Sequence, residues 1–242
     1  FCLSRGLGDV YKRQVVHDSI KMLVVGPVAL LITGFLAFIV IGPIALILGT
    51  GITNGVTYVF EHAGWLGGAL YGLLYAPLVI TGLHHMFLAV DFQLMGSSLG
   101  GTYLWPILAI SNICQGSAAF GAWIVYKRKK MVKEEGLAFT SGISGVLGVT
   151  EPALFGVNLP LKYPFIAAIL TSSVLGAFIG AHKVLGSVGV GGWPAFISIK
   201  SEFWWIYLPA TLIATVVPAV LTIVFSRFSN QKAKKMVDTS NS

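Results

Sequence analysis

Long apolar segments, rather than alternating polar and apolar positions, dominate this chain of 242 residues. A membrane-spanning helix needs about 20 mostly apolar residues. Four stretches meet that length, at residues 22–49, 66–90, 103–126 and 203–225. A fifth apolar region, 137–182, is interrupted near "NLPLKYP". The pattern predicts an all-α integral membrane protein, a multi-span helical transporter with re-entrant or broken helices.

Two basic clusters flank these segments and predict their orientation. "KRKKMVK", residues 127–133, has five basic residues in seven, and the tail carries Arg227, Lys232, Lys234 and Lys235. Such clusters are typical of the cytoplasmic side of a membrane protein. We interpret them as orientation signals rather than as a site for nucleic acid or lipid headgroups.

Counting crossings shows that simple spans are not sufficient. If Lys21 and both basic clusters are cytoplasmic, the first span exits, the second returns, and the third would end outside although "KRKK" follows it. We therefore expect an element between residues 66 and 126 that enters and leaves on the same side. By the same reasoning 137–182 makes one net crossing, although it has the length for about two. Hydrophobic segments interrupted by Gly and Pro are the best sequence pointer to a transporter's binding site, and "LGVTEPALFG" is such an interruption.

Composition supports the membrane class. Charged residues are 10% of the chain, whereas a soluble domain carries about 25%. The two cysteines, Cys2 and Cys114, provide neither a disulfide framework nor a zinc motif. We expect no metal site and no cofactor.

Glu151 is the sharpest chemical signal, because a carboxylate at membrane depth costs a few kcal/mol and usually marks a substrate or ion pathway. The alternative is a glutamate on a surface loop between two helices. Pro152 removes a backbone donor and disfavours helix at the residue before it. We therefore expect Glu151 on extended or turn backbone, facing a cavity, where it accepts hydrogen bonds from sugar hydroxyls or deprotonates one of them.

A histidine pair is the second signal. His84 and His85 point in different directions on a helix, so they are poorly placed to share a metal, and either one can equally be a packing residue. Asp91 lies two helical turns beyond His84 if the helix continues, and is otherwise a loop residue.

Neutral polar residues add hydrogen-bonding capacity within the apolar segments. Asn112, Gln115 and Asn158 supply both donors and acceptors, as a sugar requires. Hydrogen bonding between helices is the alternative. Trp105 is interpreted as a residue of the membrane interface, although one of the tryptophans could stack on a sugar.

Taken together, "GLHH", "ISNICQGSA" and "GVTEPALFGVNLPLKYPF" resemble the membrane IIC domain of the glucose–sucrose–trehalose branch of the bacterial phosphoenolpyruvate-dependent phosphotransferase system. "HHMFLAVDFQLMGSSLGGTYLWPILAISNICQGSA" and "VGVGGWPAFISI" look most like trehalose-specific members. The resemblance covers residues 15–228, followed by a cytoplasmic tail at 229–242. Residues 1–14, "FCLSRGLGDVYKRQ", resemble translated sequencing adaptor, and we expect them to be non-native and the natural protein to extend further.

The resemblance implies a homodimeric, multi-pass sugar permease of the bacterial cytoplasmic membrane. Phosphate would pass from phosphoenolpyruvate through a IIA histidine and a IIB cysteine to the 6-hydroxyl of a disaccharide, with trehalose as the expected substrate. Glu151 matches the family's sugar-contacting glutamate and is the expected catalytic residue. His84 and His85 match its histidine pair. No IIB cysteine motif or IIA domain is seen in the chain, so we expect activity to require IIA and IIB as partners.

Other functions remain open from the residues alone. Sucrose, maltose, glucose or a β-glucoside could replace trehalose. A proton-coupled secondary sugar transporter could use Glu151 with His84 or His85 to carry protons. A membrane scaffold without transport is the third class. Phosphorylated sugar appearing inside vesicles, dependent on phosphorylated IIB, would separate the first function from the other two.

Overall fold

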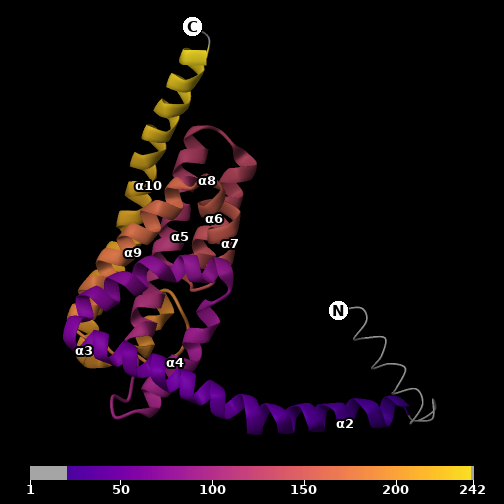
Figure 1. Ribbon diagram of the computed structural model, residues 1–242. Coiled ribbons are helices and arrows are strands. Elements are labelled where there is room, and N and C mark those ends of the chain that lie inside the picture. Colours follow the sequence, from indigo (N-terminus) through magenta and orange to yellow (C-terminus); the bar gives the residue numbers. More distant parts are fainter. Residues whose placement is uncertain (1–20, 241–242) are drawn as a thin grey trace. The chain divides into compact units, whose positions relative to one another are not determined.

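The computed structural model describes residues 21–240, with side chains placed over residues 25–228 (Figure 1). Every named element in this part of the chain is a helix, and the only bridges between extended residues there are Thr102–Gly186 and Gly186–Ile199. The predicted all-α fold is therefore confirmed. The expectation for residues 1–14 lies outside the described residues. The backbone of the expected tail continues the last helix as far as Ser240.

Four helical segments of the described chain are long and apolar enough to cross a membrane. They are Val25–Thr81, Leu104–Arg128, Tyr163–Ala181 and Ser201–Phe228. The chain divides into two units, residues 1–51 and 52–242, and each is described by itself.

The first unit contains the apolar stretch predicted at 22–49, which is helical throughout. It consists of α2 (Lys21–Leu36), a π-helical turn η2 (Ala37–Ile41) and the beginning of α3 (Gly42–Thr81). Large apolar side chains such as Leu30 and Phe38 are 75% and 85% exposed in the isolated chain. Water disfavours such exposure, whereas lipid does not.

In the second unit, α3 and α4 form a hairpin. The backbone of Ala63 leaves helical conformation (φ −143°, ψ 54°), and α3 then continues to Thr81. After a turn at Gly82, α4 (His84–Gly96) runs back along it, because the rings of Tyr71 and Tyr75 contact Phe87 and His84 respectively. The prediction of one span over 66–90 is wrong, since the chain reverses inside that range. The expected broken element after residue 66 is this hairpin, and α4 alone is too short to span a bilayer.

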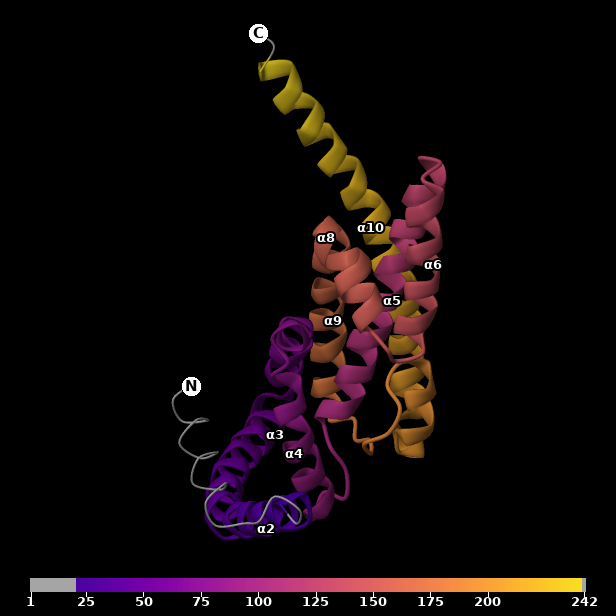
Figure 2. The same cartoon turned by 90° about the vertical axis from the view of Figure 1, so that its right-hand side faces the viewer.

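A second hairpin follows the central helix α5 (Leu104–Arg128). Helix α6 (Val132–Val146) packs back against α5, where Gly116 meets Gly142 and Gly145 at backbone contact. The chain reverses at 147–150 and returns beside α5 through three short elements, α7 (Glu151–Ala153), the π-helical η3 (Leu154–Asn158) and α8 (Leu159–Leu161), as Figure 2 shows.

Helix α9 (Tyr163–Ala181) follows and is long and apolar enough to cross a membrane. The region 137–182 therefore consists of a hairpin and one long helix, and its single net crossing stays a prediction. Both arms of the hairpin, α6 and the returning segment, bury small side chains against α5. This packing covers one face of the hairpin with protein, as non-helical backbone at membrane depth requires. The shared apolar cluster consists of Ala119, Ala122, Ala138, Ala153 and Val157.

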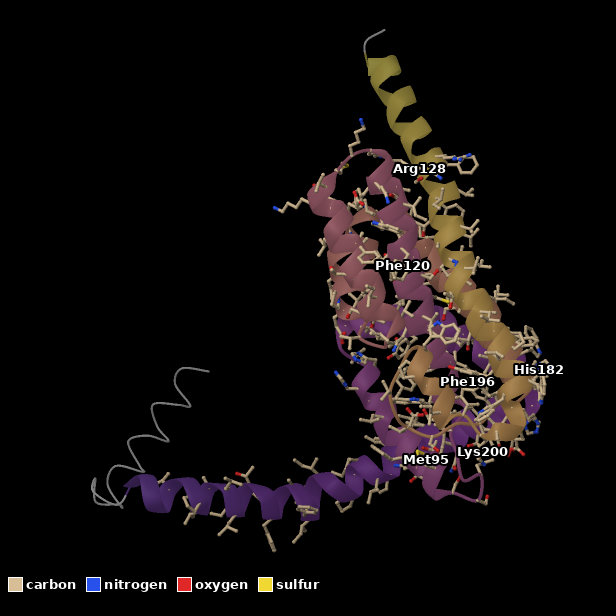
Figure 3. The ribbon with its side chains drawn as sticks, turned by 180° about the vertical axis from the view of Figure 1, so that it is seen from behind. Met95, Phe120, Arg128, His182, Phe196 and Lys200 are labelled. Atoms are coloured by element: carbon tan, nitrogen blue, oxygen red, sulfur yellow. The ribbon has the colours of Figure 1, made fainter. Side chains whose placement is uncertain are left out.

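The last helix places the two basic clusters at one end of the second unit. After two 3₁₀ turns, η4 (Trp193–Ser198) and η5 (Ser201–Phe203), α10 (Trp204–Ser240) runs parallel to α5. The Tyr207 hydroxyl donates to the Pro106 carbonyl (3.4 Å), and the Ser117 hydroxyl donates to the Thr215 carbonyl (2.6 Å). Figure 3 shows Arg128 at one end and Lys200 near the other.

Helices α3 and α9 cross at a stripe of small residues. At each crossing point a Cβ added to the glycine would overlap a carbonyl oxygen of the facing helix. Residues with small side chains at every fourth position allow such close backbone packing in membranes. The paired positions are Gly64 with Gly180, Gly68 with Gly176, and Gly72 with Ser172.

This contact predicts opposite effects for two alanine substitutions in α3. Gly68→Ala should destabilise the protein by about 1–3 kcal/mol, because the new Cβ forces the two helices apart. Gly55→Ala is the matched control, because no atom lies within 4 Å of its Cβ position, and alanine favours helix. Melting temperatures of the purified proteins in detergent measure both effects. Equal melting temperatures would show that α3 and α9 do not pack as described.

The shared end of α5 and α10 predicts that Lys130 and Met236 face the cytoplasm. In a Cys2→Ser background, Lys130→Cys and Met236→Cys should resist a membrane-impermeant thiol reagent in intact cells and react after lysis. Ser201→Cys is the matched control at the opposite end, and it should react in intact cells. The remaining Cys114 is buried. Labelling of position 130 or 236 from outside would overturn this orientation.

Candidate functional site

A cavity of about 270 Å³ lies between the two hairpins of the second unit. Its volume is close to the lower limit of typical small-molecule pockets, about 300 Å³. Helices α3, α4 and α5, the reversal of the second hairpin and the loop before η4 all contribute to its wall. The lining residues are Tyr75, His84, His85, Leu88, Asp91, Trp105, Leu108, Asn112, Gly148, Gly189 and Gly191.

The predicted histidine pair lies in this cavity. Both residues occupy the first turn of α4, directly after the reversal at Gly82. Their ring centroids are 4.0 Å apart, and Tyr75 meets the His84 ring edge-on at 6.2 Å. Among the described residues, no three His, Cys, Asp or Glu side chains are grouped so that they could hold a metal ion. The pair can instead donate or accept hydrogen bonds, depending on its tautomers.

The reversal of the second hairpin forms the opposite wall. Gly148 has φ +107°, which favours glycine. A Cβ added to Gly148 would lie 2.6 Å from the carbonyl group of Gly191, which leaves no room for a side chain. Gly192 has φ +67° and packs against the same turn. The Asn112 amide donates to the Gly148 carbonyl (3.3 Å) from α5. The reversal is therefore fixed from two sides by backbone contacts that admit no side chain.

Glu151 begins the returning arm of the hairpin. It is the first residue of α7, with Pro152 in the first turn, so the expectation of extended backbone at Glu151 is corrected. Proline is tolerated there because the first turn of a helix leaves its N–H groups without helical partners anyway. Glu151 is exposed and is not among the lining residues, but it follows the lining residue Gly148 by three positions. The beginning of α7 is therefore next to the cavity wall.

Two of the predicted ligands contact each other rather than the cavity. The Asn158 amide donates to the backbone carbonyl of Gln115 (2.9 Å) and to its side-chain oxygen (2.8 Å), and both residues are buried. This pair ties the returning arm to α5. A direct sugar contact by Gln115 or Asn158 stays a prediction, whereas Asn112 does line the cavity.

The structure also places in the cavity wall two residues whose position the sequence left open, together with loop glycines that it did not single out. Asp91 falls on the cavity side because α4 continues past it for more than a turn. Trp105 lines the cavity from the first turn of α5; the sequence favoured an interface residue and left open which tryptophan could stack on a sugar. The spacing of seven residues between His84 and Asp91 was the one sequence feature that could place Asp91 in the site. Nothing in the sequence marked the loop glycines Gly189 and Gly191 as lining residues.

Comparisons with known proteins agree with this architecture. The family model "Phosphotransferase system, EIIC" matches residues 9–172. The PTS system trehalose-specific EIIBC component of Bacillus subtilis (strain 168) is 48% identical over 224 residues, which are 92% of this chain and 47% of that protein. The sucrose-specific EIIBC component of Staphylococcus xylosus is 44% identical over 193 residues, 78% of this chain and 40% of that protein.

A further relative is the trehalose-specific EIIBC component of Escherichia coli (strain K12), 39% identical over 222 residues, which are 91% of this chain and 46% of that protein. The chain thus spans about half the length of these relatives. No solved structure matches it significantly. The family match covers more than half of the chain, and four described segments can cross a membrane. The chain therefore belongs to the phosphotransferase-system EIIC family and is a multi-pass protein of the bacterial cytoplasmic membrane.

Proposed function

We propose that this chain is the membrane part of a phosphotransferase-system permease that binds a disaccharide and presents one of its hydroxyls to phosphorylated IIB. The supporting observation is the cavity that brings His84, His85 and Asn112 beside the hairpin reversal preceding Glu151. Trehalose is the proposed sugar, in keeping with the trehalose-specific relative that is 48% identical, and sucrose is the second candidate because of the relative at 44%. IIA, IIB and a second copy of the chain are the proposed partners.

The cavity wall suits a neutral, hydroxyl-rich ligand. The histidines and Asn112 provide donors and acceptors from two helices, and Leu88 and Leu108 provide apolar surface between them. A pocket of mostly apolar lining with a few directed polar groups is the usual form of a small-molecule site. In this arrangement the polar groups hold and orient the sugar.

Glu151 is proposed to act on the hydroxyl that receives phosphate. The bond between phosphorus and the IIB cysteine sulfur breaks, a bond from phosphorus to the sugar 6-oxygen forms, and the hydroxyl proton passes to the Glu151 carboxylate. Phosphoryl transfer depends mainly on positioning and electrostatics. Glu151 is exposed in the isolated chain at the beginning of α7, which leaves its carboxylate free to take this role.

A proton-coupled sugar transporter is the second candidate. It is favoured by the titratable His84 and His85 in the cavity wall and by Glu151 three residues after the lining Gly148, since such groups can relay protons. Membrane vesicles containing the complete protein separate the two functions. Sugar phosphate should accumulate only with phosphorylated IIB if the first function holds, whereas free sugar should accumulate with a proton gradient if the second does.

The histidine pair should contribute to sugar affinity without being essential for folding. A neutral hydrogen bond contributes roughly 0.5–1.5 kcal/mol, so His84→Ala or His85→Ala should weaken sugar binding by about tenfold or less. His182→Ala is the matched control, because that histidine is exposed at the end of α9 and bonds only to the Phe178 carbonyl. Equilibrium binding of labelled trehalose to membranes measures the effect. Normal affinity in both cavity variants would make the pair structural.

Removing the charge of Glu151 should affect the reaction more than binding. Glu151→Gln keeps the shape and one acceptor oxygen, so sugar binding should fall little. Phosphorylation should fall by at least about 10²-fold, because a positioned base typically contributes 10²–10⁴-fold. Glu151→Ala should impair both. The assay is phosphorylation of labelled trehalose by membranes with the complete protein and phosphorylated IIB, alongside equilibrium binding of the same sugar.

Glu61→Gln serves as the control for a carboxylate-to-amide change, because Glu61 is exposed and does not line the cavity. It should phosphorylate sugar at the normal rate. Near-normal phosphorylation by the Glu151→Gln protein would exclude the role as base. An equal loss of binding and rate would restrict Glu151 to holding the sugar.

A further inference from the structure

One side of the cavity contains a buried carboxylate that the proposed reaction does not use. Asp91 is 1% exposed and lines the cavity from α4. One of its oxygens accepts a hydrogen bond from the Thr102 hydroxyl at 2.5 Å. Its other oxygen has no hydrogen-bond partner among the described residues. Thr102 itself is fixed, because its hydroxyl oxygen accepts the Leu104 backbone N–H (3.0 Å).

A buried carboxylate with a free oxygen is unfavourable unless something supplies a donor. Leaving a polar group without a hydrogen bond in apolar surroundings costs free energy, and the cost is larger for a charged group. No lysine or arginine of the described chain lines this cavity. The remaining Asp91 oxygen is free to accept a hydrogen bond from a group inside the cavity, and a ligand hydroxyl is such a group.

Trp105 lines the same cavity, three residues after the Thr102 whose hydroxyl bonds Asp91. Its ring lines the wall, and its Nε1–H is buried without a partner among the described residues. An indole offers a broad apolar face that matches the C–H face of a pyranose ring, and its N–H is a donor only. Asp91 and Trp105 thus combine an acceptor with an aromatic surface, as a sugar ring requires.

Along α4, Asp91 is well separated from His84, which lies at the end of the cavity where the phosphoryl transfer is proposed. Asp91 is seven residues beyond His84 in one continuous helix, which corresponds to a rise of about 10 Å. That separation exceeds the span of one pyranose ring and suits two linked rings. The first ring would lie near His84 and Glu151, and the second near Asp91 and Trp105.

We propose that Asp91 and Trp105 form the subsite for the second ring of a disaccharide and select disaccharides over monosaccharides. Asp91 accepts hydrogen bonds from hydroxyls of that ring, Trp105 packs against its C–H face, and Thr102 is a positioning residue that orients the Asp91 carboxylate. This inference rests on the proposed function, because it assigns the second half of the same ligand.

The test compares a disaccharide with a monosaccharide in the complete purified protein. Affinities for trehalose, sucrose and glucose are measured by competition with a labelled disaccharide. Asp91→Asn removes the charge and one of the two acceptor oxygens, so it should weaken binding of the more tightly bound disaccharide by about tenfold. Affinity for glucose, bound at the other end, should change less than about threefold. Trp105→Leu should show the same selectivity loss and provides an independent variant.

Glu202→Gln is the matched control, because Glu202 is an exposed carboxylate that does not line the cavity. It should leave all affinities unchanged. The melting temperature without sugar is measured for every variant, so that unfolding is not mistaken for lost binding. If glucose binds wild-type protein too weakly to measure, the loss of disaccharide affinity at unchanged melting temperature supports the subsite.

Two results would overturn the subsite while leaving the proposed function intact. One is normal disaccharide affinity in both the Asp91→Asn and Trp105→Leu proteins. The other is an equal loss for disaccharide and glucose. By contrast, a wild-type protein that binds none of the three sugars would overturn the proposed function itself, and the subsite with it.

Discussion

The close packing of the Gly148 reversal against Gly191 and Gly192 is the constraint on which the site depends. Backbone meets backbone there at distances that exclude a Cβ. Because the reversal cannot shift without opening this contact, the beginning of α7 has a fixed place beside the cavity. Glu151 is therefore positioned by glycines, which have no functional side chain. The Asn112 amide completes the arrangement by bonding the Gly148 carbonyl.

The second hairpin can exist at membrane depth only because protein covers it. Lipid offers no partners for free N–H and C=O groups. Three features meet this requirement in the returning arm: it is helical or π-helical throughout, it packs on α5 through small residues, and Asn158 bonds Gln115. The same logic applies to α3 and α4, whose hairpin is anchored on α9 by glycine contacts at every fourth residue of α3. Both hairpins are thus packed against other helices, and both contribute residues to the cavity wall.

Much of this fold follows from the sequence, and the exceptions have physical reasons. Apolar length predicted the long helices, whereas the orientation drawn from the basic clusters and the single crossing of 137–182 stay predictions. The span assigned to 66–90 failed because apolar length alone does not reveal the reversal at Gly82. Glu151 was expected on extended backbone because proline restricts the residue before it, but the first turn of a helix accommodates that proline.

The site was only partly predictable for a similar reason. His84, His85 and Asn112 were singled out as polar residues in apolar surroundings, and they do line the cavity. Gln115 and Asn158 have the same signature, but they bond to each other, and sequence cannot show which polar residues pair across helices. The sequence named Asp91 and Trp105 as possibilities, but only the length of α4 and the packing of α4 and α5 place both residues in the cavity wall.

The most direct test is a structure of the complete protein with a bound disaccharide. The account predicts sugar density in the cavity along α4, with a hydroxyl of one ring within hydrogen-bonding distance of Glu151 and the second ring between Asp91 and Trp105. Sugar bound elsewhere in the protein, or a cavity that remains empty while the protein binds sugar, would contradict it.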